Sequence, residues 1–253
     1  MPLAVLPARI CDIEAVYDVY FKAFEHQAVL RFLFPGGIDR KTHTEGTKNM
    51  WNVDTNGYPI KCVDTDTGEI IGMACWDIFW KPSAESTWPK PEGAVWLEGK
   101  DRETADAILV PIWNMHEKLF GEHKHIYLPT IAVRPDHQRR GAGRLLMQWG
   151  ITMAENLSLP IYLESTGPGN SLYEAMGFER LTHVQIIHKA AITGEPEDTE
   201  VPLMVKMPSN ARGMTFKEWT DKGYPETGHL SLERGLLSSD EPELLWARQT
   251  RTA

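Results

Sequence analysis

The stretch of sequence that decides the fold is Val133-Arg134-Pro135-Asp136-His137-Gln138-Arg139-Arg140-Gly141-Ala142-Gly143-Arg144. An apolar run at residues 125–133 leads into it and predicts a strand, which Arg134 and Pro135 end. Residues 141–156 follow with apolar side chains at helical spacing. The segment is therefore predicted to be a turn between a strand and a helix, with two glycines at the start of the helix.

The chemistry of this turn favours an anionic ligand. Glycines allow a close approach of the backbone, and the amides at a helix start attract negative charge. Four arginines accompany Asp136 here, in a chain whose net charge is −9. These features predict a cradle for a diphosphate. The alternative is a tight turn with solvated arginines, and the strand–turn–helix context favours the cradle.

Outward from this turn, the hydrophobic pattern predicts an alternation of strands and helices. Strands are expected at residues 3–6, 59–63, 69–80, 125–133, 160–163, 178–189 and 201–207. Helices are expected at residues 12–23, 40–51, 103–120, 141–156 and 171–176. We expect Asp12 to cap the first helix, Pro111 to kink or split the third, and Gly177 to end the last in a left-handed conformation.

A second motif follows at Leu172-Tyr173-Glu174-Ala175-Met176-Gly177-Phe178. Together the two segments resemble the GCN5-related N-acetyltransferase (GNAT) family. The first matches its acetyl-CoA pyrophosphate loop, V-x-P-x-x-Q-x-x-G-x-G, and the second its L-Y-x-x-x-G-F segment. The order of elements is also similar, and the resemblance covers roughly residues 3–207.

The resemblance implies an α/β fold with a mixed, mostly antiparallel sheet. Helices cover both faces, and two central strands splay apart. The domain organisation we expect is an acetyltransferase domain at residues 1–207 and a C-terminal extension at 208–253. A proline-rich insertion at about 81–99 lies outside the common pattern, and a further helix is expected at 241–248.

The resemblance also implies how acetyl-CoA, the co-substrate, is held. The pantetheine arm pairs with the splayed strand, and the turn binds the pyrophosphate. A backbone amide of the same strand is also expected to donate a hydrogen bond to the thioester oxygen. The expected cofactor-binding residues are Ile131, Ala132, Val133, Gln138, Arg139, Arg140, Gly141, Ala142, Gly143 and Arg144. One departure is Thr166, which stands where family members often carry an asparagine; Asn170 lies nearby at a different offset.

Two residues are the candidates for catalysis. Tyr173 is implied as the general acid that protonates the departing thiolate, the alternative being a helix tyrosine that packs near Phe178. Glu164 is our candidate general base, because it ends a buried strand beside the expected cleft. Its alternative is a solvated or capping carboxylate, and His125 and Asp77 are weaker candidates for the base.

Composition bounds the class of protein. The chain has 253 residues, 42% hydrophobic and 24% charged, with 26 Lys and Arg against 35 Asp and Glu. This acidic balance argues against a protein that coats nucleic acid or an anionic membrane. No apolar run of membrane-spanning length and no signal-peptide pattern is present. Three cysteines without C-x-x-C spacing indicate reduced thiols, and hence a cytoplasmic protein.

The same reading predicts no metal site. His116-Glu117 lacks a second histidine at the zincin offset, and His123 with His125 lacks a third ligand. Cys62 is expected away from the thioester, as is Cys75. Four tryptophans crowd the hairpin and the insertion, either as walls of an acceptor pocket or, as we favour, as anchors of the insertion: Trp76, Trp80, Trp88 and Trp96.

The predicted reaction is acetyl transfer to a primary amine by direct attack in a ternary complex, with no acyl-enzyme. The acceptor would be a small-molecule or peptide amine, and the protein a monomer or homodimer. One alternative is a CoA-binding sensor or scaffold without turnover. Another is a nucleotide-binding module for ATP or NAD, which is disfavoured because the Gly-x-x-x-x-Gly-Lys-Ser/Thr loop is missing.

Overall fold

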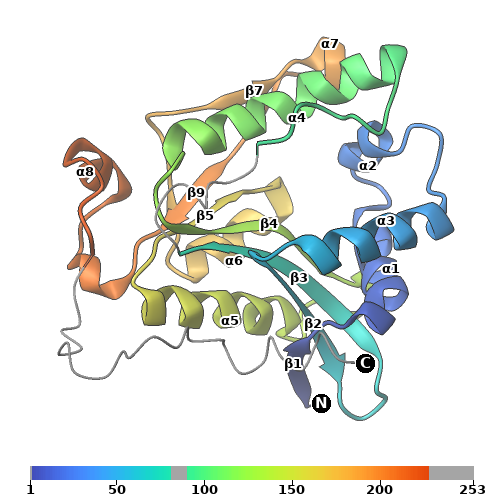
Figure 1. Cartoon of the computed structure of the whole chain (residues 1–253), viewed down its shortest axis with the longest axis horizontal. Helices are drawn as coiled ribbons and strands as arrows, with labels where there is room; N and C mark the ends of the chain where they lie inside the picture. The colour runs from blue at the N-terminus through green and yellow to red at the C-terminus, as the bar shows by residue number, and fades with distance from the viewer. Residues whose placement is uncertain (1, 81–89, 228–253) are drawn as a thin grey trace.

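The computed structural model describes residues 2–80 and 90–227. The expectations for Trp88, for the part of the insertion at 81–89 and for the helix at 241–248 lie outside the described residues. The remaining elements form a mixed α/β structure, drawn in Figure 1.

A seven-stranded sheet in the order β1-β2-β3-β4-β5-β9-β6 forms the centre of the molecule. Its strands are β1 (Leu3–Pro7), β2 (Gly57–Asp64), β3 (Ile70–Phe79), β4 (His125–Val133), β5 (Ile161–Glu164), β6 (Glu179–Arg180) and β9 (Leu203–Lys206). Every neighbouring pair is antiparallel except β4 and β5, which run parallel. The expected mixed, mostly antiparallel sheet is confirmed.

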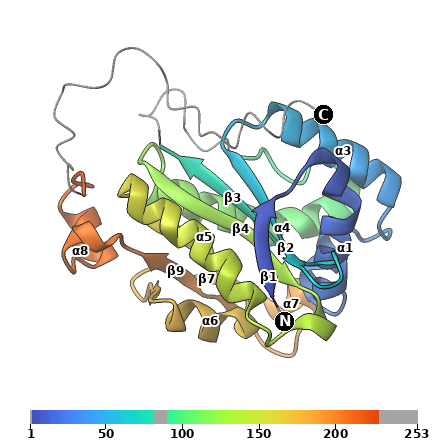
Figure 2. The same ribbon diagram turned by 90° about the horizontal axis from the view of Figure 1, so that it is seen from below.

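Helices cover both faces of this sheet, as expected (Figures 1 and 2). Figure 2 shows α5 and α6 along one face, with α1, α3 and α4 on the other. The helices are α1 (Ile13–Phe24), α2 (Ala28–Leu33), α3 (Arg40–Val53), α4 (Gly99–Leu119), α5 (Ala142–Leu157), α6 (Asn170–Ala175), α7 (Ala190–Thr193) and α8 (Phe216–Asp221). The sequence pattern did not indicate α2, α7 or α8.

Alternation of side chains along the central strands, interrupted by register shifts, divides the core into layers. On β3, Trp76 and Ile78 pack in the cluster beneath α5, whereas Phe79 belongs to the cluster beneath α4. A third cluster lies beneath α1 and contains Met73. Asp77 points to the same face as Phe79 and Met73, so it lies between the apolar clusters of α1 and α4.

Two of the expected strands are wrong in extent. Residues 178–189 form β6 and a separate strand β7 (Ile186–His188), and β7 pairs with β8 (Thr199–Val201) in a second, two-stranded sheet. Pro202 separates β8 from β9. Since proline has no N–H to donate to a ladder, the chain changes its pairing partner at this position.

Two local features differ from the expectation. Pro111 does not split α4, which continues as a single helix from Gly99 to Leu119. Asp12 makes no capping hydrogen bond to α1. Its Oδ2 accepts instead from the Arg9 amide at 2.8 Å and from Lys61 Nζ at 2.6 Å, so it ties the start of α1 to β2. Gly177, by contrast, has the expected left-handed conformation, with φ +82°.

The segment after Pro208 packs on the domain. Phe216 and Trp219 of α8 are buried in the cluster that also contains Tyr162 of β5. The Tyr224 hydroxyl donates to the Leu119 carbonyl at 2.9 Å. The last described residues therefore belong to the same core as the sheet.

Candidate functional site

The two central strands β4 and β5 separate soon after they meet. They pair only at Ile126 with Ile161 and at Tyr127 with Tyr162. Beyond these positions β4 continues to Val133, while the described β5 residues pair with β9. Pro129 is exposed in the middle of β4. This divergence is the expected splay, and it leaves one side of the β4 backbone without a strand partner among the described residues.

The glycine-rich turn begins α5 at this opening. Gly141 is the N-cap and has φ +93°, in the left-handed region. The first helical hydrogen bond runs from the Leu145 amide to the Gly141 carbonyl at 3.0 Å, so the amides at 142–144 precede the bonded ladder. A Cβ on Gly141 would meet nothing within 4 Å, whereas one on Gly143 would lie 3.3 Å from Leu172 Cδ2. The turn is thus open on one side and packed against α6 on the other.

The arginines of the turn divide into two pairs. Arg134 contacts Glu69 and Asp136. Arg140 Nη2 lies 2.5 Å from Asp64 Oδ2. Both of these guanidinium groups are held by carboxylates, so the local positive charge is smaller than the sequence count indicated.

The other two, Arg139 and Arg144, are exposed and form no ion pair with another described residue. Arg139 has φ +62°, an unusual conformation for a residue with a side chain. The turn therefore offers an anion two exposed guanidinium groups and the amides at the start of α5.

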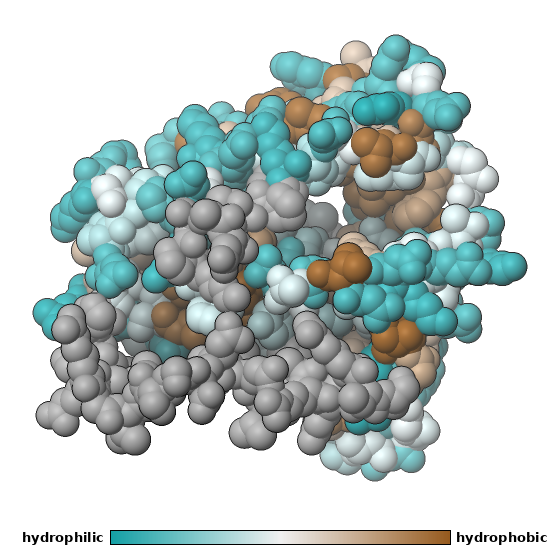
Figure 3. Space-filling view, in the orientation of Figure 1, coloured by the Kyte–Doolittle hydropathy of each residue, from teal (hydrophilic) through white to brown (hydrophobic). Residues whose placement is uncertain are grey.

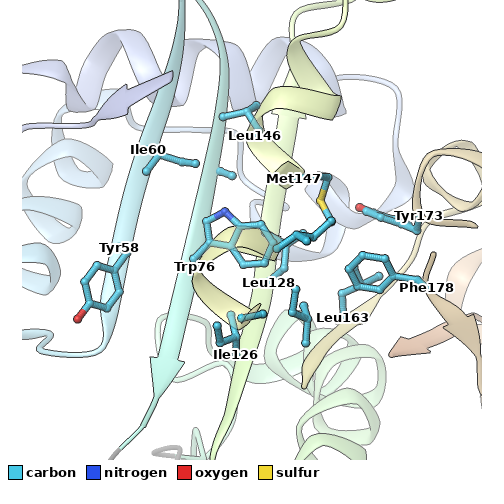
Figure 4. Packing of buried hydrophobic residues seen from close by; sticks show 14 of the residues in the cluster. Tyr58, Ile60, Trp76, Ile126, Leu128, Leu146, Met147, Leu163, Tyr173 and Phe178 are labelled. Atoms are coloured by element: carbon cyan, nitrogen blue, oxygen red, sulfur yellow. The ribbon is translucent and has the colours of Figure 1, made fainter. Parts of the chain in front are cut away.

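Tyr173 lies beneath α5, in the same cluster as Leu128 and Leu163 from the two separating strands. It is 6% exposed, and a Cβ on Gly169 would come within 2.8 Å of its ring. Figure 4 shows its hydroxyl directed toward Met147 of α5. This hydroxyl makes no hydrogen bond with another described residue, and burial raises the pKa of Tyr173 to about 12. At neutral pH the side chain is a phenol with a proton to give.

Glu164 lies on the opposite face, at the end of β5. Its Oε2 accepts a hydrogen bond of 2.9 Å from the Tyr127 hydroxyl, and its Oε1 is buried without a partner in the described structure. Burial raises the pKa of Glu164 to about 7, partly offset by the adjacent hydroxyls of Tyr162 and Tyr127. A carboxyl that titrates near neutral pH suits a general base.

The two weaker candidates for the base have different surroundings. His125 is fully buried, and its ring nitrogens contact the His123 carbonyl at 2.7 Å and His116 Nε2 at 2.7 Å. Both nitrogens are therefore engaged inside the core, which argues against this histidine as the base. Asp77 forms no hydrogen bond or ion pair with another described residue, and burial, followed by the charge of Asp54, raises the pKa of Asp77 to about 7.

The connection from β5 to α6 differs from the family pattern at Thr166, which is exposed. Asn170 begins α6, and its Oδ1 is buried without a hydrogen-bond partner in the described structure. The motif spacing predicted neither the exposure of Thr166 nor the unpartnered oxygen of Asn170. An unsatisfied amide oxygen beside Tyr173 marks Asn170 as a candidate ligand contact.

The described tryptophans of the hairpin and the insertion have different surroundings and do not form one cluster. Trp76 is fully buried beneath α5, with its ring centroid 6.3 Å from that of Trp149, so it neither lines a pocket nor anchors the insertion. Trp96 Nε1 donates to the Leu33 carbonyl at 3.1 Å and ties the end of the insertion to α2, as we favoured. Trp80 is 36% exposed at the end of β3.

Several neighbours of the site were missed by the sequence analysis. These are Tyr127, Tyr162 and Asp54 around the carboxyl groups, together with Asp64 and Glu69 beside the turn. The alternation Tyr162-Leu163-Glu164 does place Tyr162 and Glu164 on one face of a strand, and this signal was available in the sequence. The partners from other strands have no such local signal.

Within residues 2–80 and 90–227, no group of three or more His, Cys, Asp or Glu side chains is arranged to hold a metal ion. None of the helices in the described ranges has the length and apolarity that crossing a bilayer requires.

Comparison with solved structures identifies the class of fold. Mosquito arylalkylamine N-acetyltransferase like 5b matches with a TM-score of 0.58 at 15% identity, covering 81% of this chain and 100% of that one. A second match is a structure from Corynebacterium glutamicum described as histone acetyltransferase HPA2 and related acetyltransferase. Its TM-score is 0.51 at 23% identity, and the match covers 82% of this chain and 97% of that one. The fold is that of acetyltransferases.

The sequence comparisons identify the family. The model of the acetyltransferase (GNAT) family matches residues 14–178. A probable acyltransferase, SID5 of Ajellomyces capsulatus, is 36% identical over 145 residues, which are 57% of this chain and 99% of that relative. The chain belongs to the acetyltransferase (GNAT) family, whose general reaction is acetyl transfer from acetyl-CoA.

Proposed function

We propose that this protein transfers the acetyl group of acetyl-CoA to a primary amine by direct attack in a ternary complex. One observation carries the proposal. Tyr173 and Glu164 lie on opposite faces of the sheet at the place where β4 and β5 separate. A thioester threaded between these strands would have a proton donor on one side and a proton acceptor on the other.

The residues for acetyl-CoA are those of the turn and the splayed strand. The turn amides and the side chains of Arg139 and Arg144 suit a diphosphate, and the open space at Gly141 allows its approach. Ile131, Ala132 and Val133 offer backbone groups for the pantetheine arm on the side facing away from β3. When bound, acetyl-CoA supplies the activated acetyl group.

The protons move through the two side chains. Glu164 accepts a proton from the ammonium form of the acceptor, directly or through water, and the free amine then attacks the thioester carbonyl to form the new N–C bond. Tyr173 gives its proton to the thiolate as the C–S bond breaks, and is later reprotonated from solvent. The cysteines are unsuited to an acyl-enzyme, because burial raises the pKa of Cys75 to about 12 and Cys62 is fully buried beneath α5.

Calorimetric titration with acetyl-CoA tests the first half of the proposal. We expect binding in the micromolar range, and no heat at several hundred micromolar acetyl-CoA would refute it. Release of free CoA in the presence of a panel of primary amines tests the second half. Binding without release would favour the alternative, a CoA-binding sensor or scaffold.

The Tyr173→Phe variant tests the acid. We expect kcat to fall by about 10²–10⁴ with little change in acetyl-CoA affinity, because the ring still packs and only the proton is lost. A matched control is Tyr224→Phe, which removes a hydroxyl bonded to a carbonyl at a distance from the site. Equal rates for wild type and Tyr173→Phe in single-turnover measurements would exclude this role.

A further inference from the structure

The hairpin that joins β2 and β3 lies beside the glycine-rich turn. Gly72 of β3 is paired with Val133 at the end of β4, and the Arg134 amide donates to the Ile71 carbonyl at 2.9 Å. The end of this hairpin, residues 64–69, lies at the lower right of Figure 3 and has a mainly hydrophilic surface. The turn therefore leaves the sheet next to a polar hairpin end.

Asp64, the last residue of β2, is held in one orientation by this hairpin end. It is 2% exposed, its amide donates to the Glu69 carbonyl at 2.9 Å, and its carbonyl accepts from the Gly68 amide at 2.8 Å. Its Oδ1 accepts from the Asp66 amide at 3.1 Å, while its Oδ2 accepts from Arg140 Nη2 at 2.5 Å. The Arg140 guanidinium holds the pKa of Asp64 below its usual value, so the carboxylate is charged at neutral pH.

A second set of contacts joins the turn to the other side of the hairpin. Arg134 donates through Nη1 to Glu69, and through Nε and Nη2 to the two carboxylate oxygens of Asp136 at 3.1 and 2.6 Å. His137 Nδ1 lies 2.5 Å from Arg140 Nη1, and it must be the acceptor because a guanidinium can only donate. Its Nε2 is 3.7 Å from Glu69 Oε2. Both guanidinium groups are therefore fixed to the same hairpin.

The residues on either side of Arg140 have left-handed backbones. Arg139 has φ +62° and Gly141, the N-cap of α5, has φ +93°. A left-handed conformation at a residue with a side chain persists only where the surrounding structure holds it. Arg140 lies between the two positions, so its ion pair with Asp64 fixes the peptide groups that lead into the start of α5.

We propose that Asp64, acting through Arg140, is a positioning residue for acetyl-CoA. It holds the turn in the conformation that presents the amides at the start of α5 to the pyrophosphate, and a site organised before binding loses less free energy on binding. The paired arginines hold the turn, which leaves Arg139 and Arg144 to meet the anion. The inference rests on the proposed function, because it concerns the acetyl-CoA site of the same reaction.

Calorimetric titration of the full-length protein with acetyl-CoA tests the proposal in Asp64→Asn, a nearly isosteric change. We expect Kd to rise about tenfold, because the charge-assisted bond to Arg140 is lost. At saturating acetyl-CoA, kcat should stay within about twofold of wild type, since Tyr173 and Glu164 lie on other elements. A purely structural role would lower the stability and leave Kd unchanged.

A matched control is Asp198→Asn, beside the separate two-stranded sheet. Asp198 likewise accepts from a cation and from a backbone amide, namely Lys189 Nζ at 2.7 Å and the Ala190 amide at 2.9 Å. This variant should bind acetyl-CoA as wild type does. Circular dichroism verifies that each variant is folded. Should Asp64→Asn not fold, Glu69→Gln replaces a carboxylate of the same network whose side chain is 40% exposed, and its Kd should rise about threefold.

A double-mutant cycle shows whether Asp64 acts through Arg140. The variant that combines Asp64→Asn with Arg140→Gln should bind acetyl-CoA no more weakly than Arg140→Gln alone. Losses that multiply, or equal Kd values for wild type and a folded hairpin variant, overturn the inference. Acetyl-CoA binding and CoA release by the wild type would then leave the acetyltransferase proposal standing. Failure of the wild type to bind acetyl-CoA overturns both.

Discussion

The hydroxyl of Tyr127 and the carboxyl of Glu164 are joined by a hydrogen bond of 2.9 Å across the two central strands. The bond spans the place where β4 and β5 stop pairing. It fixes the orientation of the candidate base, and it stabilises the carboxylate form of Glu164 against the effect of burial. The rate and its pH dependence should both respond to Tyr127.

Removing this hydroxyl should change the pH profile. In Tyr127→Phe the carboxylate loses a donor, so the pKa of Glu164 should rise further above about 7. The acidic limb of kcat/KM should move to higher pH by about 0.5–1 unit, since a hydrogen bond contributes about 1 kcal/mol. Tyr224→Phe serves as the control. An unmoved acidic limb would show that Glu164 does not set it.

The titration of Glu164 should also affect stability. Its pKa in the folded protein is raised to about 7, so the folded state resists ionisation and the wild type loses stability as pH rises from about 4.5 to 7. Glu164→Gln lacks this loss. Relative to wild type, its free energy of unfolding should increase by about 1–3 kcal/mol between pH 4.5 and pH 8.

Urea unfolding at several pH values measures this difference. The exposed Glu174 supplies the control, because Glu174→Gln should track the wild type at every pH. A Glu164→Gln curve parallel to wild type would mean that the carboxyl is as well solvated in the folded state as in the unfolded one.

The left-handed conformation of Gly141 should matter for acetyl-CoA. Gly141→Ala strains a position with φ +93° and places a methyl group on the open side of the turn. We expect the affinity for acetyl-CoA to fall about tenfold, together with a loss of about 1 kcal/mol in stability. Gly194→Ala imposes the same kind of strain at φ +73° on a remote helix end and should change stability alone. Equal acetyl-CoA affinity in the two variants would contradict the cradle.

The contact between α5 and the sheet allows no side chain at Gly150. A Cβ there would lie 2.3 Å from the Trp76 ring, and Trp76 is fully buried. Gly150→Ala should therefore destabilise the protein by about 1–3 kcal/mol through overpacking. Gly46→Ala on the exposed side of α3 meets nothing within 4 Å and should stabilise the protein by up to about 1 kcal/mol. Thermal unfolding compares the pair, and a neutral Gly150→Ala would mean that Trp76 can move.

Much of the fold could be predicted because its signals are local. The apolar run at 125–133, the two glycines of the turn and the helix after them predicted β4 and α5 nearly to the residue. The strand expected at 178–189 failed because its second half pairs with β8, a partner that periodicity alone does not reveal. The hydrophobic pattern likewise did not reveal that α4 continues through Pro111.

The sequence by itself determined the strand–turn–helix that suits a diphosphate and the positions of Tyr173 and Glu164 along the chain. Only the tertiary structure decided what surrounds them. The pKa of Glu164 becomes about 7 because burial raises it by more than the hydroxyls of Tyr162 and Tyr127, the latter from another strand, lower it. Asp77 and Asp54 become neighbours because Gly57 leaves room between them. Spacing fixes which groups are present, whereas burial and contacts between distant segments fix their protonation and their partners.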